Sequence, residues 1–182
     1  YISAAGMQWA GKNALAELQE HYPKLHKVQT ESECGDGSRD WKAAEYTFSL
    51  MRHYFNHGTN LYLYWNMVLD DSGNSTWGWK QNALVSVNKT TGEVTYTPEF
   101  HLFRHFAQFI PKDSVKLAGD GNFDSALAFL TPSGELVVFA ANTHDAEQPV
   151  SFLVGDRAFE AKLPARSFHT FRIPGGAKTQ AN

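Results

Sequence analysis

The sequence contains a single cysteine, Cys34, which excludes an internal disulfide and any metal site built from several cysteines. Its longest apolar runs, such as residues 136–141, are far too short to cross a bilayer, so we expect no membrane span. The formal net charge is only -3 and no block of one sign occurs, so we expect no nucleic-acid partner. Residues 1–10 lack a charged region leading into a long apolar one, so we expect no export signal in the chain.

Aromatic residues are plentiful by contrast. Phe, Trp and Tyr make up 14% of the chain, and tryptophans beside polar residues suit a surface that stacks on the apolar faces of sugars. With 182 residues the chain is shorter than a complete TIM barrel of about 250 residues, so any barrel within it is partial.

The first part of the chain alternates short apolar segments with segments of helical period, which predicts repeated βα units and a parallel sheet. A helix capped by Asn13 and stopped by Pro23 follows the first strand, and a helix capped by Asp40 and ended by Gly58 follows the second. A long loop that ends at Asn82 follows the third strand, and such loops in compact domains usually bind something. The three predicted strands are Ile2–Trp9, Leu25–Thr30 and Leu61–Trp65, and a last helix is predicted at Phe100–Phe109, between Pro98 and Pro111.

Beyond Pro111 the pattern changes to short strands at regular intervals, separated by turns such as Pro132-Ser133-Gly134. This spacing predicts an antiparallel β-sandwich over Ser114–Pro174. The predicted strands are Ala126–Leu130, Leu136–Ala141, Val150–Val154, Phe159–Leu163 and Phe168–Ile173.

Two carboxylates, Glu31 and Glu33, stand where the second strand gives way to a loop, on the side where TIM barrels build active sites. A glutamate there can attack an anomeric carbon if a second carboxyl group lies about 5 to 5.5 Å away. The pattern fits two solvated loop acids equally well.

Three segments in this region carry a family resemblance. They are Thr30–Gly35, with the sequence T-E-S-E-C-G, the tripeptide Tyr64-Trp65-Asn66, and Thr76–Trp79, with the sequence T-W-G-W. Together they resemble glycoside hydrolase family 30, which includes glucosylceramidases and endo-β-1,6-glucanases, and the similarity runs in order from about Gly6 to Ile173.

The resemblance implies a fold and a nucleophile. It implies an α/β plus all-β chain, in which residues 1–113 are the C-terminal part of a TIM (β/α)8 barrel, strands six to eight, and residues 114–182 a small antiparallel β-sandwich. Glu31 matches the family's catalytic nucleophile, because it comes first after the apolar strand and follows a Thr. A competing alignment places the nucleophile at Glu33.

The chain departs from the family in one respect. The family's acid/base glutamate follows an Asn at the end of barrel strand four, and this sequence has no Asn-Glu dipeptide. We therefore expect the general acid to come from a missing N-terminal barrel segment, without which the chain is inactive.

Other polar and aromatic residues fall at the same ends of the predicted strands. Their match to family positions implies a substrate-binding set in which indoles stack on a pyranose and amides bind its hydroxyls. For the tryptophans, barrel filling or ordinary loop packing is the alternative. The set is Gln8, Trp9, Glu33, Trp65, Asn66 and Trp77, with Trp79 beside it.

We expect no metal and no cofactor. His101 and His105 have the i, i+4 spacing of zinc ligands on a helix, but no His-Glu pair lies between them and no third ligand is near in sequence.

The predicted function is hydrolysis of β-linked glucosides, with β-1,6-glucan as the favoured substrate and Glu31 forming the glycosyl-enzyme intermediate. Two alternatives remain: glucosylceramidase-type activity, and a non-catalytic glycan-binding or accessory fragment. The resemblance implies an extracellular or periplasmic location.

Overall fold

The computed structural model describes residues 2–155 and 157–175, which form two compact units that divide between Phe103 and Arg104. Helix α3 (Pro98–Phe109) runs across this division. The other elements of the first unit are β1 (Ala4–Gln8), the 3-10 helix η1 (Trp9–Ala14), α1 (Leu15–His21), β2 (His26–Glu31), α2 (Trp41–Asn56), β3 (Thr59–Tyr62), β4 (Val68–Asp70), β5 (Val85–Val87) and β6 (Val94–Tyr96).

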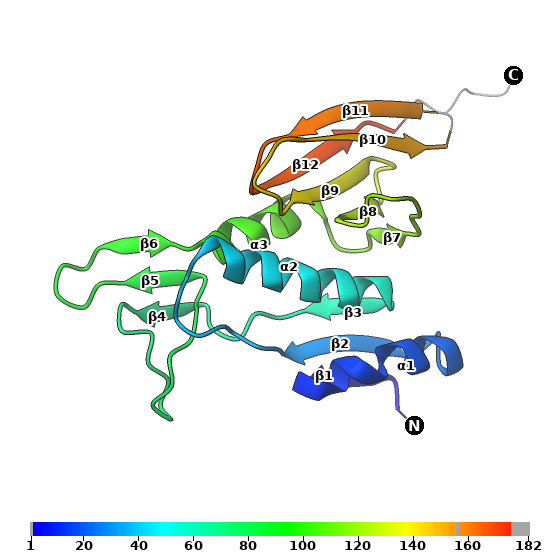
Figure 1. Cartoon of the computed structure of the whole chain (residues 1–182). Coiled ribbons are helices and arrows are strands. Elements are labelled where there is room, and N and C mark those ends of the chain that lie inside the picture. Colours follow the sequence, from blue (N-terminus) through cyan, green and yellow to red (C-terminus); the bar gives the residue numbers. More distant parts are fainter. Residues whose placement is uncertain (1, 156, 176–182) are drawn as a thin grey trace, which may run out of the picture. The chain divides into compact units, whose positions relative to one another are not determined.

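Strands β1, β2 and β3 form a parallel sheet in that order, which confirms the predicted βα units (Figure 1). Helices α1 and α2 connect these strands, and a cluster of Met7, Leu15 and Tyr54 joins one face of the sheet to both helices. Since parallel strands need such crossover connections, the alternation of apolar periods in the sequence was sufficient to predict this part of the fold.

Helix α2 begins and ends as its sequence predicts. The Asp40 side chain accepts a hydrogen bond from the Ala43 backbone N–H at 2.9 Å, and Gly58 has a φ of +75°, a conformation in which glycine ends helices without strain.

The predicted cap of the first helix is wrong. Asn13 lies inside η1, and the N-cap of α1 is Ala14, which makes no side-chain capping bond. The chain turns into η1 directly after β1 and continues from there into α1, so the first helical turn is reached before Asn13.

The segment after β3 is more ordered than predicted. Part of the expected loop forms β4, which pairs in parallel with β5, and β6 pairs antiparallel with β5. Arg39 holds this small sheet from the loop after β2, since its guanidinium donates to Ser86 Oγ at 2.7 Å and to the backbone oxygen of Asp70 at 3.0 Å. The strands have only three residues each, too few for a clear alternation in the sequence.

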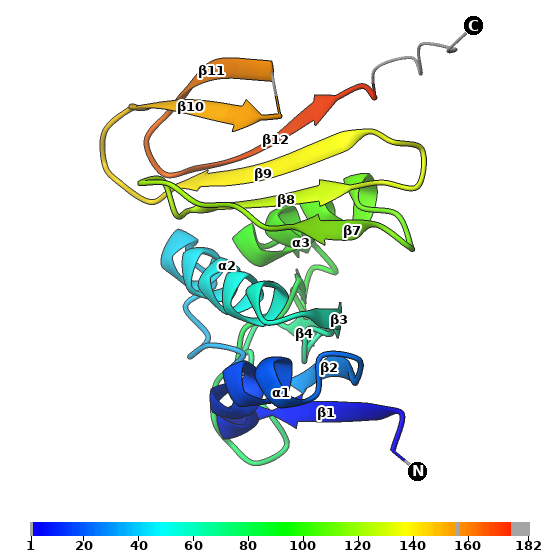
Figure 2. The same cartoon turned by 90° about the vertical axis from the view of Figure 1, so that its right-hand side faces the viewer.

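The second unit contains the predicted antiparallel strands, with one more, β7, at its start (Figure 2). One sheet has the order β12-β9-β8-β7, and β10 and β11 form a separate pair. The strands are β7 (Val115–Leu117), β8 (Ala126–Leu130), β9 (Leu136–Asn142), β10 (Gln148–Val154), β11 (Arg157–Leu163) and β12 (Ser167–Ile173).

Strand β9 is the centre of this unit, and all its residues are buried. On one face the ring of Phe139 lies 4.7 Å from that of Phe106 in α3. On the other face Ala140 packs with Val150 of β10 and Leu163 of β11. A strand covered on both faces reads as a continuous apolar run, as this one does.

Candidate functional site

The carboxyl ends of β1, β2 and β3 meet at one edge of the parallel sheet, which is where open and barrel α/β folds place their ligands. Gln8, the last residue of β1, lies opposite Glu31, the last residue of β2. An irregularity in the register between Met7 and Gln8 precedes this pair. Such irregularities re-aim side chains next to active sites.

The Glu31 carboxylate receives two hydrogen bonds at this edge. The side-chain amide of Gln8 donates to Oε2, and the Trp9 indole Nε1 donates to Oε1 at 2.7 Å. Each oxygen therefore has its own donor, which fixes the orientation of the carboxylate. Glu31 nevertheless remains partly exposed, so a ligand can approach it.

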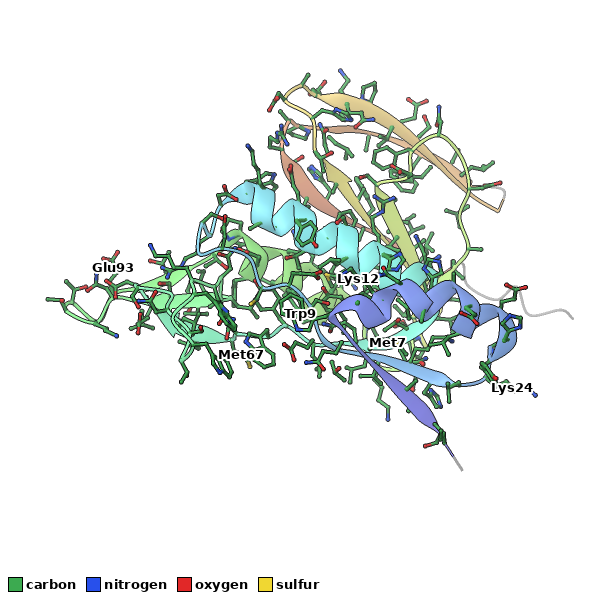
Figure 3. All side chains as sticks on the ribbon, turned by 60° about the horizontal axis from the view of Figure 1, so that its bottom comes forward. Met7, Trp9, Lys12, Lys24, Met67 and Glu93 are labelled. Carbon is green, nitrogen blue, oxygen red and sulfur yellow. The ribbon has the colours of Figure 1, made fainter. Side chains whose placement is uncertain are left out.

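Trp9 reaches Glu31 from an unusual backbone conformation. Its φ is +47°, in the left-handed region, and a bulky residue there costs roughly 1 to 3 kcal/mol. Trp9 is the first residue of η1, at the turn that follows β1, and Figure 3 shows it near Lys12 and away from Lys24, which precedes the other end of β2. Strain of this kind persists where the surroundings hold a residue in place.

Glu33 has different surroundings from Glu31. Its Oε1 lies 2.5 Å from Lys12 Nζ, and its Oε2 is buried without a hydrogen-bond partner among the described residues. Burial favours the neutral acid and by itself would raise the pKa of Glu33. The hydrogen bond from Lys12 and a backbone hydrogen bond together outweigh burial, so the pKa of Glu33 falls below its usual value. The two glutamates therefore occupy distinct positions, one aimed by neutral donors and one bound in an ion pair.

Behind the edge, Gln29 links β2 to β3. Gln29 is fully buried, donates to Ser32 Oγ at 2.8 Å and accepts from the Leu63 backbone N–H at 2.7 Å. These bonds connect the side chains of two residues that flank Glu31 and join β2 to the segment after β3.

Trp65 and Asn66 follow β3, which ends at Tyr62 rather than at Trp65 as the sequence predicted. Trp65 is 41% exposed and available to a ligand. The Asn66 amide nitrogen donates to Gln81 Oε1 at 3.2 Å and to the Asn82 backbone oxygen at 3.0 Å, so it also holds the long loop.

Asn82 is a buried junction that the sequence analysis missed. Its side chain donates to Glu99 Oε1 at 2.6 Å and accepts from the Arg39 backbone N–H at 3.2 Å, and its own N–H donates to the Cys34 oxygen at 2.6 Å. The approach is so close that a Cβ at Gly35 would lie 2.6 Å from the Asn82 amide nitrogen. Asn82 therefore ties the loops after β2 and β3 to the start of α3.

Glu99 is fully buried, and its second oxygen, Oε2, has no partner among the described residues. Burial raises the pKa of Glu99, although the Asn82 hydrogen bond opposes this. The sequence Thr97-Pro98-Glu99 is a helix-start signal that explains an acid at this position but does not predict its burial.

Trp77 and Trp79 lie on the long loop, where Asn74 and Lys80 form an isolated bridge. Their rings stack with centroids 5.5 Å apart and planes inclined by 16°. They are 67% and 54% exposed, which is high for tryptophan. The stacked pair therefore presents a flat aromatic surface to solvent.

Across residues 2–155 and 157–175, no group of three or more His, Cys, Asp or Glu side chains is placed to hold a metal ion. His105 Nδ1 lies 2.8 Å from Thr170 Oγ1, so a structural role accounts for this histidine. In the same part of the chain, no helix is long and apolar enough to cross a membrane.

Part of the chain is similar to a known glycoside hydrolase domain. Residues 115–171 match the profile described as "Glycosyl hydrolase family 30 beta sandwich domain". The chain is also 23% identical to lysosomal acid glucosylceramidase of Mus musculus over 192 aligned positions, which cover 94% of the chain and 37% of the mouse protein. Residues 115–171 therefore resemble the β-sandwich domain of glycoside hydrolase family 30, and nearly the whole chain is similar to a glucosylceramidase.

Solved structures share the fold. SrfJ from Salmonella typhimurium superposes with a TM-score of 0.83 at 17% identity, covering 94% of this chain and 40% of SrfJ. An endo-beta1,6-glucanase superposes with a TM-score of 0.80 at 19% identity, covering 96% of this chain and 42% of the glucanase. The chain thus spans about two fifths of the length of these proteins.

Proposed function

We propose that this chain carries the nucleophile half of the active site of a retaining β-glycosidase. The observation that supports this most directly is the Glu31 carboxylate, oriented by Gln8 and Trp9 at the carboxyl edge of a parallel sheet. Neither donor carries a charge, so the carboxylate is oriented without being neutralised by an ion pair.

In the proposed reaction, a Glu31 oxygen bonds to the anomeric carbon while the bond from that carbon to the leaving oxygen breaks. A general acid protonates the leaving oxygen, and the same group then takes a proton from the water that hydrolyses the glycosyl ester. We propose that this second glutamate comes from a barrel segment that precedes residue 1. No cofactor takes part.

This proposal treats β1, β2 and β3 as barrel strands six, seven and eight, with residues 1–113 in the catalytic domain and 114–182 in the sandwich domain. The parallel order of the three strands and the fold likeness to much longer proteins support it. Hereafter, "the complete protein" means this chain joined to that preceding segment.

The substrate we propose is β-1,6-linked glucan, and the fold shared with an endo-beta1,6-glucanase supports it. Gln8, Trp9, Trp65 and Asn66 would contact the sugar next to Glu31. The stacked rings of Trp77 and Trp79 would contact a further glucose unit, since indole faces pack well against pyranose rings. We propose an extracellular or periplasmic location, where such a polymer is met.

A glucosylceramide is the second candidate, favoured by the alignment with the mouse glucosylceramidase over 94% of the chain. Both candidates use the same Glu31 chemistry and differ only in the aglycone. Initial rates of the complete protein on linear β-1,6-glucan and on detergent-dispersed glucosylceramide separate them.

Covalent labelling tests the nucleophile. A 2-deoxy-2-fluoro glucoside with a good leaving group should inactivate the complete protein, and mass spectrometry of the digest should find the sugar on the peptide that contains Glu31. Glu31→Gln should abolish turnover and labelling, because the amide keeps the shape but cannot attack. Glu17→Gln, at an exposed position on α1, is the matched control and should behave as wild type.

Three results would contradict the proposal. An adduct on Glu33 would move the nucleophile by two residues. No adduct, together with unchanged activity of Glu31→Gln, would exclude Glu31 as the nucleophile. No activity on any glycoside would favour the non-catalytic glycan-binding role.

A further inference from the structure

Lys12 contacts both Trp9 and Glu33. Its ammonium group lies 2.5 Å from Glu33 Oε1 and donates to the Trp9 backbone oxygen at 3.4 Å. Its own backbone oxygen lies 2.9 Å from His53 Nε2, so helix α2 anchors the turn that carries it. Lys12 therefore bridges the residue after β1 and the loop after β2.

The residue that Lys12 holds is the one with the strained backbone. Trp9 has a φ of +47°, and nothing in an indole side chain favours that conformation. A relaxed φ would redirect the side chain and take its N–H away from Glu31 Oε1. A specific interaction is therefore needed to hold Trp9 in this conformation.

The Lys12–Glu33 ion pair, which supplies this interaction, is partly shielded from water. The side chains of Lys12 and Glu33 are 22% and 27% exposed, so the ion pair is screened less than one on the open surface. The pKa of Lys12 is raised, first through its hydrogen bond with Glu33, which keeps the pair charged at neutral pH. Since the Glu33 Oε2 atom has no partner among the described residues, loss of Lys12 would leave a poorly satisfied carboxylate beside the site.

We propose that Lys12 and Glu33 are a positioning pair, which holds Trp9 in its left-handed conformation so that the indole N–H orients the Glu31 carboxylate. Neither residue touches the sugar in this arrangement. The effect on catalysis rests on the proposed role of Glu31, whereas the effect on Trp9 does not.

The conformational effect can be observed without any activity. The complete protein, labelled with 15N-indole tryptophan, gives one resonance for each indole, and Trp9→Phe identifies the Trp9 signal by its loss. Lys12→Met and Glu33→Gln should shift this signal in the same direction and increase its exchange with water. Lys12→Arg, which retains the charge, should leave it near its wild-type position.

The catalytic effect is measured on an aryl β-glucoside. Each single variant should lower kcat by about tenfold or more with little change in KM, because a misplaced reacting group costs rate rather than binding. The double variant should be no worse than either single one, since both changes break the same pair. Glu33→Gln is the gentler change and serves if Lys12→Met does not fold.

An unchanged Trp9 resonance in both single variants would overturn the proposal. A higher KM in Glu33→Gln alone, with Lys12→Met unaffected, would do the same and would make Glu33 a substrate ligand. If the complete protein cleaves no glycoside while the Trp9 signal still responds as expected, the proposed function fails but the positioning pair stands.

Discussion

The indole nitrogen of Trp9 donates a 2.7 Å hydrogen bond to Glu31 Oε1, although the two residues are 22 positions apart in the sequence. A hydrogen bond to a charged group contributes roughly 1.5 to 3 kcal/mol. We expect Trp9→Phe to slow formation of the glycosyl-enzyme by about tenfold to a hundredfold if the bond persists in the transition state. Stopped-flow measurement of leaving-group release would give this rate.

Trp41→Phe is the matched control for that experiment. The Trp41 indole also donates to a carboxylate, that of Glu45 at 2.9 Å, one helical turn away in α2. The Trp41→Phe variant should form the glycosyl-enzyme at the same rate as wild type. If the two variants lose the same activity, the Trp9 bond has no particular role at Glu31.

Asn82 should be among the least replaceable polar residues of the first unit. Asn82→Ala removes the bonds to Glu99 and to the Arg39 backbone and leaves their partners buried. We expect it to lower the free energy of unfolding by about 2 to 4 kcal/mol. Asn74→Ala, at an exposed position on the same loop, should change it by less than about 0.5 kcal/mol in the same denaturant titration.

Glu99 should make stability depend on pH. Its pKa is raised above the usual 4.5 by burial, so the folded protein binds this proton more tightly than the unfolded chain does. The native state is thus favoured at low pH and loses this contribution as pH rises from about 4.5 through the folded pKa.

Glu99→Gln removes that titration. Thermal melts of both proteins at several pH values should show the midpoint difference moving in favour of the variant as pH increases from 4.5 toward neutrality. A constant difference over that range would mean that Glu99 has the same pKa in the folded and unfolded states.

The Trp77 and Trp79 surface should matter only for extended substrates. Replacing both with Ala should raise KM for a long β-1,6-glucan by about tenfold, because stacked aromatic contacts contribute about 0.5 to 1.5 kcal/mol each beyond buried area. Hydrolysis of an aryl monoglucoside should be unaffected. Tyr22 is 62% exposed and precedes the start of β2, at the opposite end of the strand from Glu31. Tyr22→Ala should therefore leave the kinetics on both substrates unchanged.

Much of the local structure could be predicted because it depends on short-range rules. Asp40 caps α2 through its own side chain, and the β8 boundaries follow from an apolar run between turns. The sandwich strands alternate or are continuously apolar according to how many faces are covered. The predicted N-cap at Asn13 is wrong because the 3-10 helix η1 begins before the expected helix start.

The sequence by itself determined the three parallel strands with their connecting helices, the antiparallel strands that follow, and the two candidate carboxylates, but not the short strands β4 to β7. Only the tertiary structure decided that Glu31 meets Gln8 and Trp9 while Glu33 meets Lys12, and that Asn82 reaches Glu99. These contacts join residues from separate elements, and their partners depend on strand register and on the left-handed turn at Trp9. A shift of one residue turns a side chain to the other face of a sheet, so the identity of neighbours across strands is fixed by the fold rather than by local spacing.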